Sequence, residues 1–533
     1  MTERRVGGAA RRLTVLAAAA TLLAACKQGP NFFSPAPPAE TAYTGPGDPV
    51  PPPASASPRK GGPAQRVAIG AKVKDEWWSL FRSPPLDRVV QQGLADSPTI
   101  AQATAVLAQG REQTLAVAGG LLPQVDLGAE AGRQAVNVEI SGVNRPAIPV
   151  NVYGIGPSVS YALDVFGGIK RQVEAQSALA DVSDYQLAAA YLALSGNITG
   201  QAITIAGLRA QIKTIGEILA EDQKNLDLVK TAQAGGTATM VDVTTAQTQL
   251  ANDRALLPPL RQQLSVARDA MRVFVGKTPA DWSPPDFDLA DLKLPPVVPV
   301  SLPSAMVRQR PDILAAEAQL HAAAAQLGVA TANLYPNFSL NAAFAQEATQ
   351  IGNLGGAYAG WSAFLNMSAP IFHGGTLHAQ QRAAKDALDA AWAAYRQTVI
   401  QSFGQVADQL QALAHDDEAV KTQLAALASA EQALRLARLS YQAGNSTLLQ
   451  LLDPQRQREQ AQLGVVRAET QRLFDTAQLL VALGSGWWNT PPALPGPQPD
   501  PHALLPGSPT AAPALPPTAA PDEGPFWERW FKS

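Results

Sequence analysis

The sequence has very little cysteine and no strong charge imbalance. A single cysteine, Cys26, occurs among 533 residues, and one cysteine cannot form an internal disulfide. Charged residues make up only 16% of the chain and its net charge is −3. The polycationic surface typical of nucleic-acid-binding proteins is therefore missing, and we expect no nucleic-acid partner.

Residues arranged for catalysis are equally scarce. The nearest approach to a metal-binding pair is His373 with His378, and no acidic residue or cysteine stands at metal-site spacing from them. The segment Gly484-Ser485-Gly486 lacks the spacing of a nucleophile elbow, and no phosphate-cradling glycine loop occurs. We expect no enzyme, no metal and no cofactor, so any energy must come from a partner protein.

The N-terminus has the pattern of an export signal. Arginines precede an apolar run from Leu13 to Ala25, which predicts a signal peptide over 1–25. This run is shorter than the roughly 20 residues that span a bilayer. Leu23-Ala24-Ala25-Cys26 resembles a bacterial lipobox, and that resemblance implies acylation of Cys26; the alternative is a chance buried cysteine. Lys27, in place of an aspartate, favours the outer membrane by analogy.

Proline-rich segments flank the central part of the chain. Residues 26–71 have no apolar period, which predicts a lipidated tether or an extended segment wrapped on the body. Residues 489–533 have the same character and end in the aromatic stretch 526–531. That tail is either disordered or a docking peptide.

The central part is an internal duplication that carries apolar heptads. Bulky apolar residues recur every seven positions in two stretches, the second 208 residues after the first: Ile198, Ile205, Ile212, Leu219 and Leu226, then Val406, Leu413, Val420, Leu427 and Leu434. A seven-residue period keeps one seam against partner helices and indicates left-handed coiled coils. We predict repeat 1 over 72–290 and repeat 2 over 291–488.

Each repeat also contains a segment with the two-residue period of a strand. In the first repeat apolar Val125, Leu127, Ala129 and Ala131 alternate with Asp126, Gly128, Glu130 and Gly132, and residues 153–165 alternate likewise. The second repeat has Phe338, Leu340, Ala342 and Phe344, then a strand through Trp361. We predict strand hairpins over 124–167 and 337–374, four long strands in all.

A sheet with one apolar and one polar face suits a wall between lipid and water. An open sheet edge in lipid leaves backbone groups unsatisfied at several kcal/mol each, so such strands must close into a barrel. Single-chain barrels need at least about eight strands, so several chains would have to share one barrel. The soluble alternative is the face of an ordinary sandwich.

The expected helices are long enough for a conduit. Residues 168–235 contain no proline and would span roughly 100 Å as a helix. The return path is expected in two pieces, 86–122 and 237–275, with Pro258 and Pro259 bending or breaking the second piece. Gly235-Gly236 and Gly444-Asn445 mark the hairpin tips, where a left-handed residue is needed.

Several motifs in the same order resemble TolC-like outer-membrane efflux proteins. They cover residues 77–488 and comprise Trp77-Trp78-Ser79-Leu80-Phe81, Leu163-Asp164-Val165-Phe166-Gly167, Arg310-Pro311-Asp312-Ile313, Leu334-Tyr335-Pro336, Pro370-Ile371-Phe372-His373-Gly374-Gly375 and Tyr441-Gln442-Ala443-Gly444. The lipobox fits the lipidated branch, which includes multidrug-efflux channels and nodulation-type lipoproteins. The resemblance implies a mainly α fold with transmembrane β structure: a homotrimer with a 12-stranded β-barrel, four strands per chain, and duplicated coiled-coil hairpins forming a periplasmic α-barrel.

The resemblance also implies a function and its residues. The family forms passive exit ducts for drugs or other small molecules, joined through a periplasmic adaptor to an inner-membrane pump, here of the RND type. Its closed periplasmic end matches Tyr441, Leu449, Asp453 and Arg456 in this chain. Leu449, Asp453 and Arg456 share one helix face, either as a ring across the bore or as a solvated face with an ion pair. Some relatives are acidic where this chain has Gln450.

The remaining implied site is the adaptor-docking surface at the hairpin tips, around Gly235, Gly236, Gly444 and Asn445. These glycines are also needed by the turns themselves. Two other classes of protein stay open. An outer-membrane-anchored periplasmic scaffold without a pore would use the same coiled coils, and a lipoprotein hydrolase would need a polar constellation that the sequence does not display.

Overall fold

The computed structural model describes residues 28–53, 65–136, 139–140, 143–144, 148–356 and 358–484. The predicted signal peptide (1–25), Cys26 and the C-terminal tail (489–533) lie outside the described residues. Within the described part the chain is mainly helical, and four long strands form one sheet. The fold class predicted for the chain, doubled helical hairpins combined with four strands, is confirmed.

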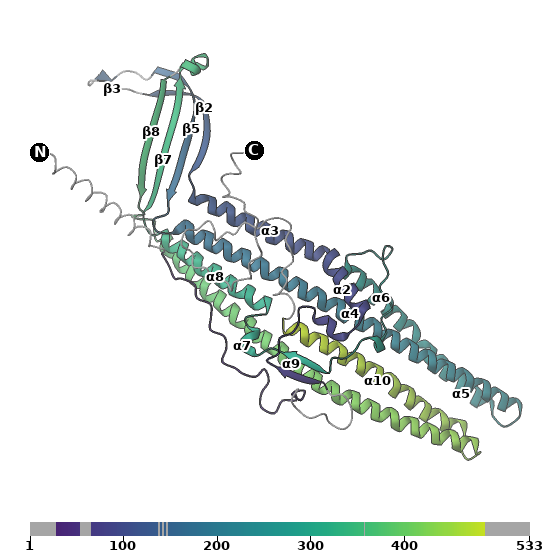
Figure 1. The fold of residues 1–533 in the computed structure, drawn as a ribbon. Helices are drawn as coiled ribbons and strands as arrows, with labels where there is room; N and C mark the ends of the chain where they lie inside the picture. The colour runs from purple at the N-terminus through teal and green to yellow at the C-terminus, as the bar shows by residue number, and fades with distance from the viewer. Residues whose placement is uncertain are drawn as a thin grey trace. The chain divides into compact units, whose positions relative to one another are not determined.

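Two very long helices organise the helical part (Figure 1). Helix α4 (Gly168–Ala234) and helix α9 (Thr376–Gln442) each run for 67 residues, roughly 100 Å at about 1.5 Å per residue. The chain returns along α4 through α5 (Met240–Ala255) and α6 (Leu257–Val275), and along α9 through α10 (Leu448–Ala482). Each repeat therefore forms one long antiparallel hairpin.

Prolines decide where the shorter helices break. Helix α5 ends at Ala255 and α6 starts at Leu257, with Pro258 and Pro259 in its first turn, as the sequence predicted. The expected single helix over 86–122 is wrong, because the chain forms α2 (Pro84–Asp96) and α3 (Pro98–Ala118) there. Pro98 excludes helical geometry from the preceding residue, and Ser97 is extended at φ −68°, ψ 125°.

The heptad positions face other helices. Ile198, Ile205 and Leu226 are buried in the first repeat, and Val406, Leu413, Val420 and Leu434 in the second. The three remaining heptad residues, Ile212, Leu219 and Leu427, are half-buried. Helix α4 packs against α3, α8 (Pro311–Ala332), α6, α5 and α10, and α9 packs against α8 and α10. The seven-residue period thus marks the seams of the helical layer.

The four long strands pair in the order β2-β5-β7-β8, all antiparallel. They are β2 (Gln124–Val136), β5 (Ile148–Leu163), β7 (Asn337–Ala348) and β8 (Tyr358–Ser368). Strands β2 and β8 are the edges of this sheet. Since β5 leads into α4 and β8 into α9, the sheet continues from the N-terminal ends of the two long helices.

One close approach fixes the pairing of β5 with β7. A Cβ atom on Gly156 would lie 1.8 Å from the carbonyl oxygen of Phe344. Only glycine lets the two backbones meet at this point.

Smaller elements complete the described part. Strands β1 (Arg66–Ile69) and β6 (Val297–Val300) pair in parallel, and β3 (Glu139–Ile140) pairs with β4 (Val143–Asn144). The 3-10 helices are η1 (Trp77–Phe81), η2 (Gly119–Leu121), η3 (Leu289–Asp291) and η4 (Ile351–Gly356), and helix α7 spans Pro303–Met306. Among the described residues, no helix combines the length and the apolarity of a membrane span.

Residues 28–53, which we call the N-terminal strap, lie along the helices. The Arg171 side chain of α4 is only 1% exposed and donates to the carbonyl oxygens of Gln28 (3.0 Å) and Gly29 (3.2 Å) and to Asn31 Oδ1 (2.9 Å). Further along the strap, the Tyr43 hydroxyl donates to the Ser301 carbonyl oxygen at 2.8 Å. Of the two forms predicted for this segment, the wrapped extended form is the one observed over these residues.

Candidate functional site

The sheet separates its side chains into one apolar and one polar face. The observed register brings the odd-numbered residues of β2, β5 and β8 to the same face as the even-numbered residues of β7. That face carries Val125, Leu127, Ala129, Tyr153, Ile155, Val159, Tyr161, Leu163, Phe338, Leu340, Ala342, Phe344, Trp361, Ala363, Leu365 and Met367. The opposite face carries Asp126, Glu130, Ser158, Ser160, Ser339, Asn341 and Asn366.

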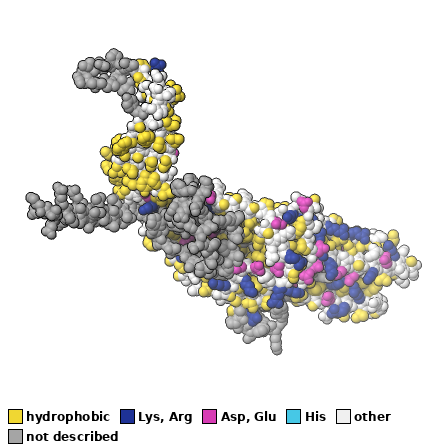
Figure 2. Space-filling model, turned by 45° about the horizontal axis from the view of Figure 1, so that its top comes forward, with side chains coloured by type: hydrophobic (Ala, Val, Ile, Leu, Met, Phe, Trp, Pro, Cys, Tyr) yellow, Lys and Arg dark blue, Asp and Glu magenta, His cyan; other side chains and the backbone are white. Residues whose placement is uncertain are grey.

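The apolar face is open in the single chain. Leu127 is 74% exposed, Trp361 81% and Leu365 66%. Hydrophobic side chains gather over the strands in Figure 2, whereas Lys, Arg, Asp and Glu are frequent over the helices. An apolar surface of this extent needs a lipid or protein partner.

The two hairpin tips are built in the same way. Gly236 and Gly444 have left-handed φ values of +77° and +75°, as the sequence predicted for the tips. The amide of Thr237 donates to the Ala232 carbonyl oxygen, and that of Asn445 to the Ser440 carbonyl oxygen, each at 2.9 Å. Gly235, by contrast, is right-handed with φ −80°. Only one glycine at each tip is therefore required by the backbone.

Each returning helix starts with a capping box. Thr239 caps α5 with Asp242, and Thr447 caps α10 with Gln450. Hydrogen bonds from the backbone amide and hydroxyl of Thr239 lower the pKa of Asp242. Gln450 Oε1 accepts from the Thr447 amide at 2.9 Å. At Gln450 this chain thus uses a neutral side chain to close the turn.

The residues predicted at the periplasmic constriction do not all meet. Asp453 and Arg456 are joined by a hydrogen-bonded ion pair at 3.0 Å and are 58% and 53% exposed at their side chains. Gln457 Nε2 also donates to Asp453 Oδ2 at 2.9 Å. Tyr441 stands apart from them, half-buried against the apolar cluster that includes Leu226, Val243 and Leu434. The side chain of Leu449 lies outside the described residues, although its backbone belongs to α10.

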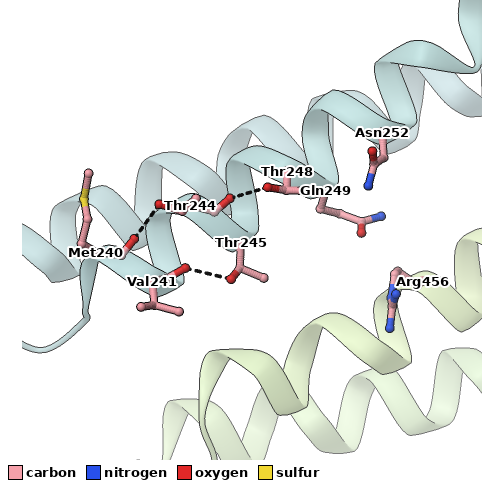
Figure 3. Close-up of a pocket in the computed structure, with 8 residues that line it drawn as sticks. All are labelled: Met240, Val241, Thr244, Thr245, Thr248, Gln249, Asn252 and Arg456. Atoms are coloured by element: carbon pink, nitrogen blue, oxygen red, sulfur yellow. Dashed lines mark hydrogen bonds between the residues drawn. The ribbon is translucent and has the colours of Figure 1, made fainter.

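A groove between α5 and α10 was not foreseen from the sequence. Its volume is ≈ 490 Å³, and Figure 3 shows its lining by Met240, Val241, Thr244, Thr245, Thr248, Gln249, Asn252 and Arg456. Met240 and Val241 are 66% and 67% exposed. Two adjacent exposed apolar residues directly after a tip were the signal available in the sequence. The groove lies beside the tip residues and the Asp453–Arg456 pair.

Comparisons with known proteins agree with this architecture. The family model for outer membrane efflux proteins matches residues 89–277 and 302–485. The pyoverdine export outer membrane protein OpmQ of Pseudomonas aeruginosa is 30% identical over 419 residues, 77% of this chain and 87% of that protein. Outer membrane protein OprJ of the same species is 28% identical over 474 residues, 88% of this chain and 94% of OprJ.

A solved structure has the same fold. The structure of the outer-membrane channel OprN aligns with a TM-score of 0.75 at 25% sequence identity, covering 87% of this chain and 100% of that chain. The resemblance found in the sequence motifs is therefore confirmed. The chain belongs to the family of outer membrane efflux proteins and is an outer-membrane channel of an efflux system.

Proposed function

We propose that three copies of the chain form a passive exit duct in which twelve strands close one β-barrel and the long hairpins form a periplasmic α-barrel. The observation that carries this proposal is the four-stranded sheet, with its open edges β2 and β8 and one mainly apolar face. In lipid such edges must pair with other strands. Four strands are too few to close around a bore.

The duct would work as one of three components. An adaptor in the periplasm and an inner-membrane pump, of the RND type in our proposal, would supply substrate and energy. The duct itself would have no catalytic activity. This assignment is supported by the match to the family of outer membrane efflux proteins and by the relative OpmQ, whose name describes an outer membrane protein of pyoverdine export.

A lipid on Cys26 would anchor each chain beside the barrel. The strap supports this part of the proposal, because the amide of Gln28 donates to the Phe166 carbonyl oxygen, at the turn between β5 and α4. Residue 28 is two positions from Cys26, and the turn lies at the end of the sheet from which the helices leave. An acyl chain on Cys26 would thus reach the inner leaflet of the same membrane.

At the periplasmic end, we propose that Asp453 and Arg456 narrow the bore with Leu449, while Tyr441 holds the hairpins together from within the apolar cluster. A ring of three Asp453–Arg456 pairs would form a barrier to ions whose height depends on whether the pairs are formed. Asp453→Ala should raise single-channel conductance in planar bilayers, with Asp291→Ala, which removes an exposed charge in η3 at the boundary between the repeats, as control. Unchanged conductance would reject Asp453 as the narrowing.

The adaptor would dock at the tips and in the adjoining groove. Gly236→Leu would disturb both adaptor docking and the turn itself, because the left-handed φ of residue 236 strains any side chain. Gly235→Leu separates them, since Gly235 is right-handed and the nearest neighbours of a Cβ atom added there would be carbonyl oxygens at 3.6 Å. Loss of export by Gly235→Leu with normal trimer assembly would support docking, and export at the wild-type rate would argue against it.

Fractionation tests whether the barrel, and not only the lipid, holds the chain in the outer membrane. A scaffold would be held only by its lipid and released by Cys26→Ser, whereas a barrel would stay in the outer membrane without the lipid.

A further inference from the structure

Three carboxyl groups from three helices meet inside the helical layer. Asp222 of α4, Asp253 of α5 and Glu459 of α10 each place one oxygen within 4.8 Å of the other two. Asp222 and Glu459 are only 3% and 4% exposed. Carboxyl groups are rarely buried this deeply unless a partner neutralises them.

The hydrogen-bond donors around the cluster are too few. Gln455, itself 2% exposed, donates through Nε2 to Asp222 Oδ1 at 2.7 Å and to Glu459 Oε1 at 3.0 Å. Gln249 donates to Asp253 Oδ2 at 2.6 Å. The second oxygen of Asp222, Oδ2, is buried and accepts no hydrogen bond from any described residue. An unpartnered buried oxygen beside two other carboxyl groups needs a neutralising ligand, either a proton shared between the carboxyl groups or a cation.

Nearby arginines do not provide that charge. Arg458 of α10 pairs with Glu221 at 2.6 Å, and Arg438 of α9 approaches the same carboxylate at 3.7 Å. Glu221 adds a fourth acidic group next to Asp222. The cluster is therefore short of positive charge.

We propose that Asp222, Asp253 and Glu459 bind one hard divalent cation of the Ca²⁺ class. Ca²⁺–oxygen bonds are about 2.3–2.6 Å long, so two oxygens on one ion can be up to about 5 Å apart. The 4.8 Å limit on the separation of these oxygens fits that requirement. Water would complete the coordination from the side of half-buried Asp253.

The bound ion would clasp the two hairpins of one chain. The ligands lie about three to four helical turns from the tips, with two in the first hairpin and one in the second. Without the ion, any carboxyl groups that stay ionised would repel one another, and this repulsion would weaken the packing of α10 against α4 and α5. This consequence rests on the proposed duct, whereas the ion site does not.

Calorimetry on the purified full-length protein in detergent tests the ion site. After removal of metals with EDTA, Ca²⁺ should bind once per chain with a dissociation constant of about 0.1–1 mM, the range of extracellular sites. The double variant Asp222→Asn/Glu459→Gln should bind at least tenfold more weakly. Glu217→Gln, an exposed neutralisation on the same helix, should bind like the wild type.

Three results would overturn the ion site. The first is the absence of calcium binding in the wild type, and the second is equal calcium binding by the double variant. The third is stabilisation of the fold when the pH is lowered from 8 to 6, with no heat from calcium, which would mean that the carboxyl groups share protons. If the double variant does not assemble, Asp253→Asn replaces it, because Asp253 is only half-buried.

Bilayer recordings test the clasp separately. Ca²⁺ should lower the conductance of the wild type and leave that of the double variant unchanged. Calcium binding with no change in wild-type conductance would keep the site and refute the clasp. A protein that forms no channels at all would refute the proposed duct while leaving the calorimetric result intact.

Discussion

The substitution Leu127→Arg distinguishes a sheet whose apolar face contacts lipid from a sheet that is surrounded by water. Leu127 is 74% exposed and lies on the apolar face, paired with Pro157 in a middle row of that face. An arginine on the lipid side of a barrel costs about 2–4 kcal/mol at the bilayer midplane. With three chains per barrel, the cost to the assembled channel is about 6–12 kcal/mol. In water, a substitution at such an exposed position would change the stability by only about 0.5 kcal/mol.

The free-energy cost of Leu127→Arg therefore differs between lipid and water by at least about 1.5 kcal/mol per chain, which corresponds to more than a tenfold change in an equilibrium constant. The assay is urea-dependent folding into lipid vesicles, scored by heat-resistant oligomers on gels. Ser158→Arg, on the polar face one row away, is the matched control and should fold like the wild type. Equal folding of the two arginine variants would refute the assignment of the apolar face to lipid.

Three further predictions concern single side chains. Arg171→Met removes the buried anchor of the strap and should cost about 3 kcal/mol; residues 28–53 should become protease-sensitive, and continued protection would contradict the anchoring role. Burial and the neighbouring Asp475 raise the pKa of Asp416 to about 7, so its protonated form stabilises the fold at low pH and that contribution is lost as the pH rises through about 7. Asp416→Asn should therefore raise the Tm at pH 8 and leave it unchanged at pH 4, and equal shifts at both pH values would argue against this titration. Gly156→Val places a side chain against the Phe344 carbonyl oxygen and should abolish heat-resistant oligomers, whereas Gly132→Val, which has open space, should not.

Features with a regular period were predictable from the sequence. The two-residue alternation in 125–131 and 153–165 correctly gave both strands and the faces of the sheet. The heptads gave the helix seams, and the tip glycines gave the reversals at Gly236 and Gly444. In each case a local backbone or packing requirement selects particular residue types and leaves a visible pattern in the sequence.

Contacts between distant segments left no such pattern. Arg171 follows Lys170 and looks like a surface arginine in the sequence, yet it is buried by a strap some 140 residues earlier. Asp222 and Glu459 read as charges on solvated helix faces, and only the packing of α4 against α10 buries them together. The groove between α5 and α10 depends in the same way on the spacing of two helices.

Single-particle electron microscopy of the purified protein in detergent tests the central claim most directly. The account predicts particles with threefold symmetry, in which three chains surround one bore and the long helices extend from the barrel. Particles containing a single chain, or a ring of any other number of chains, would contradict it.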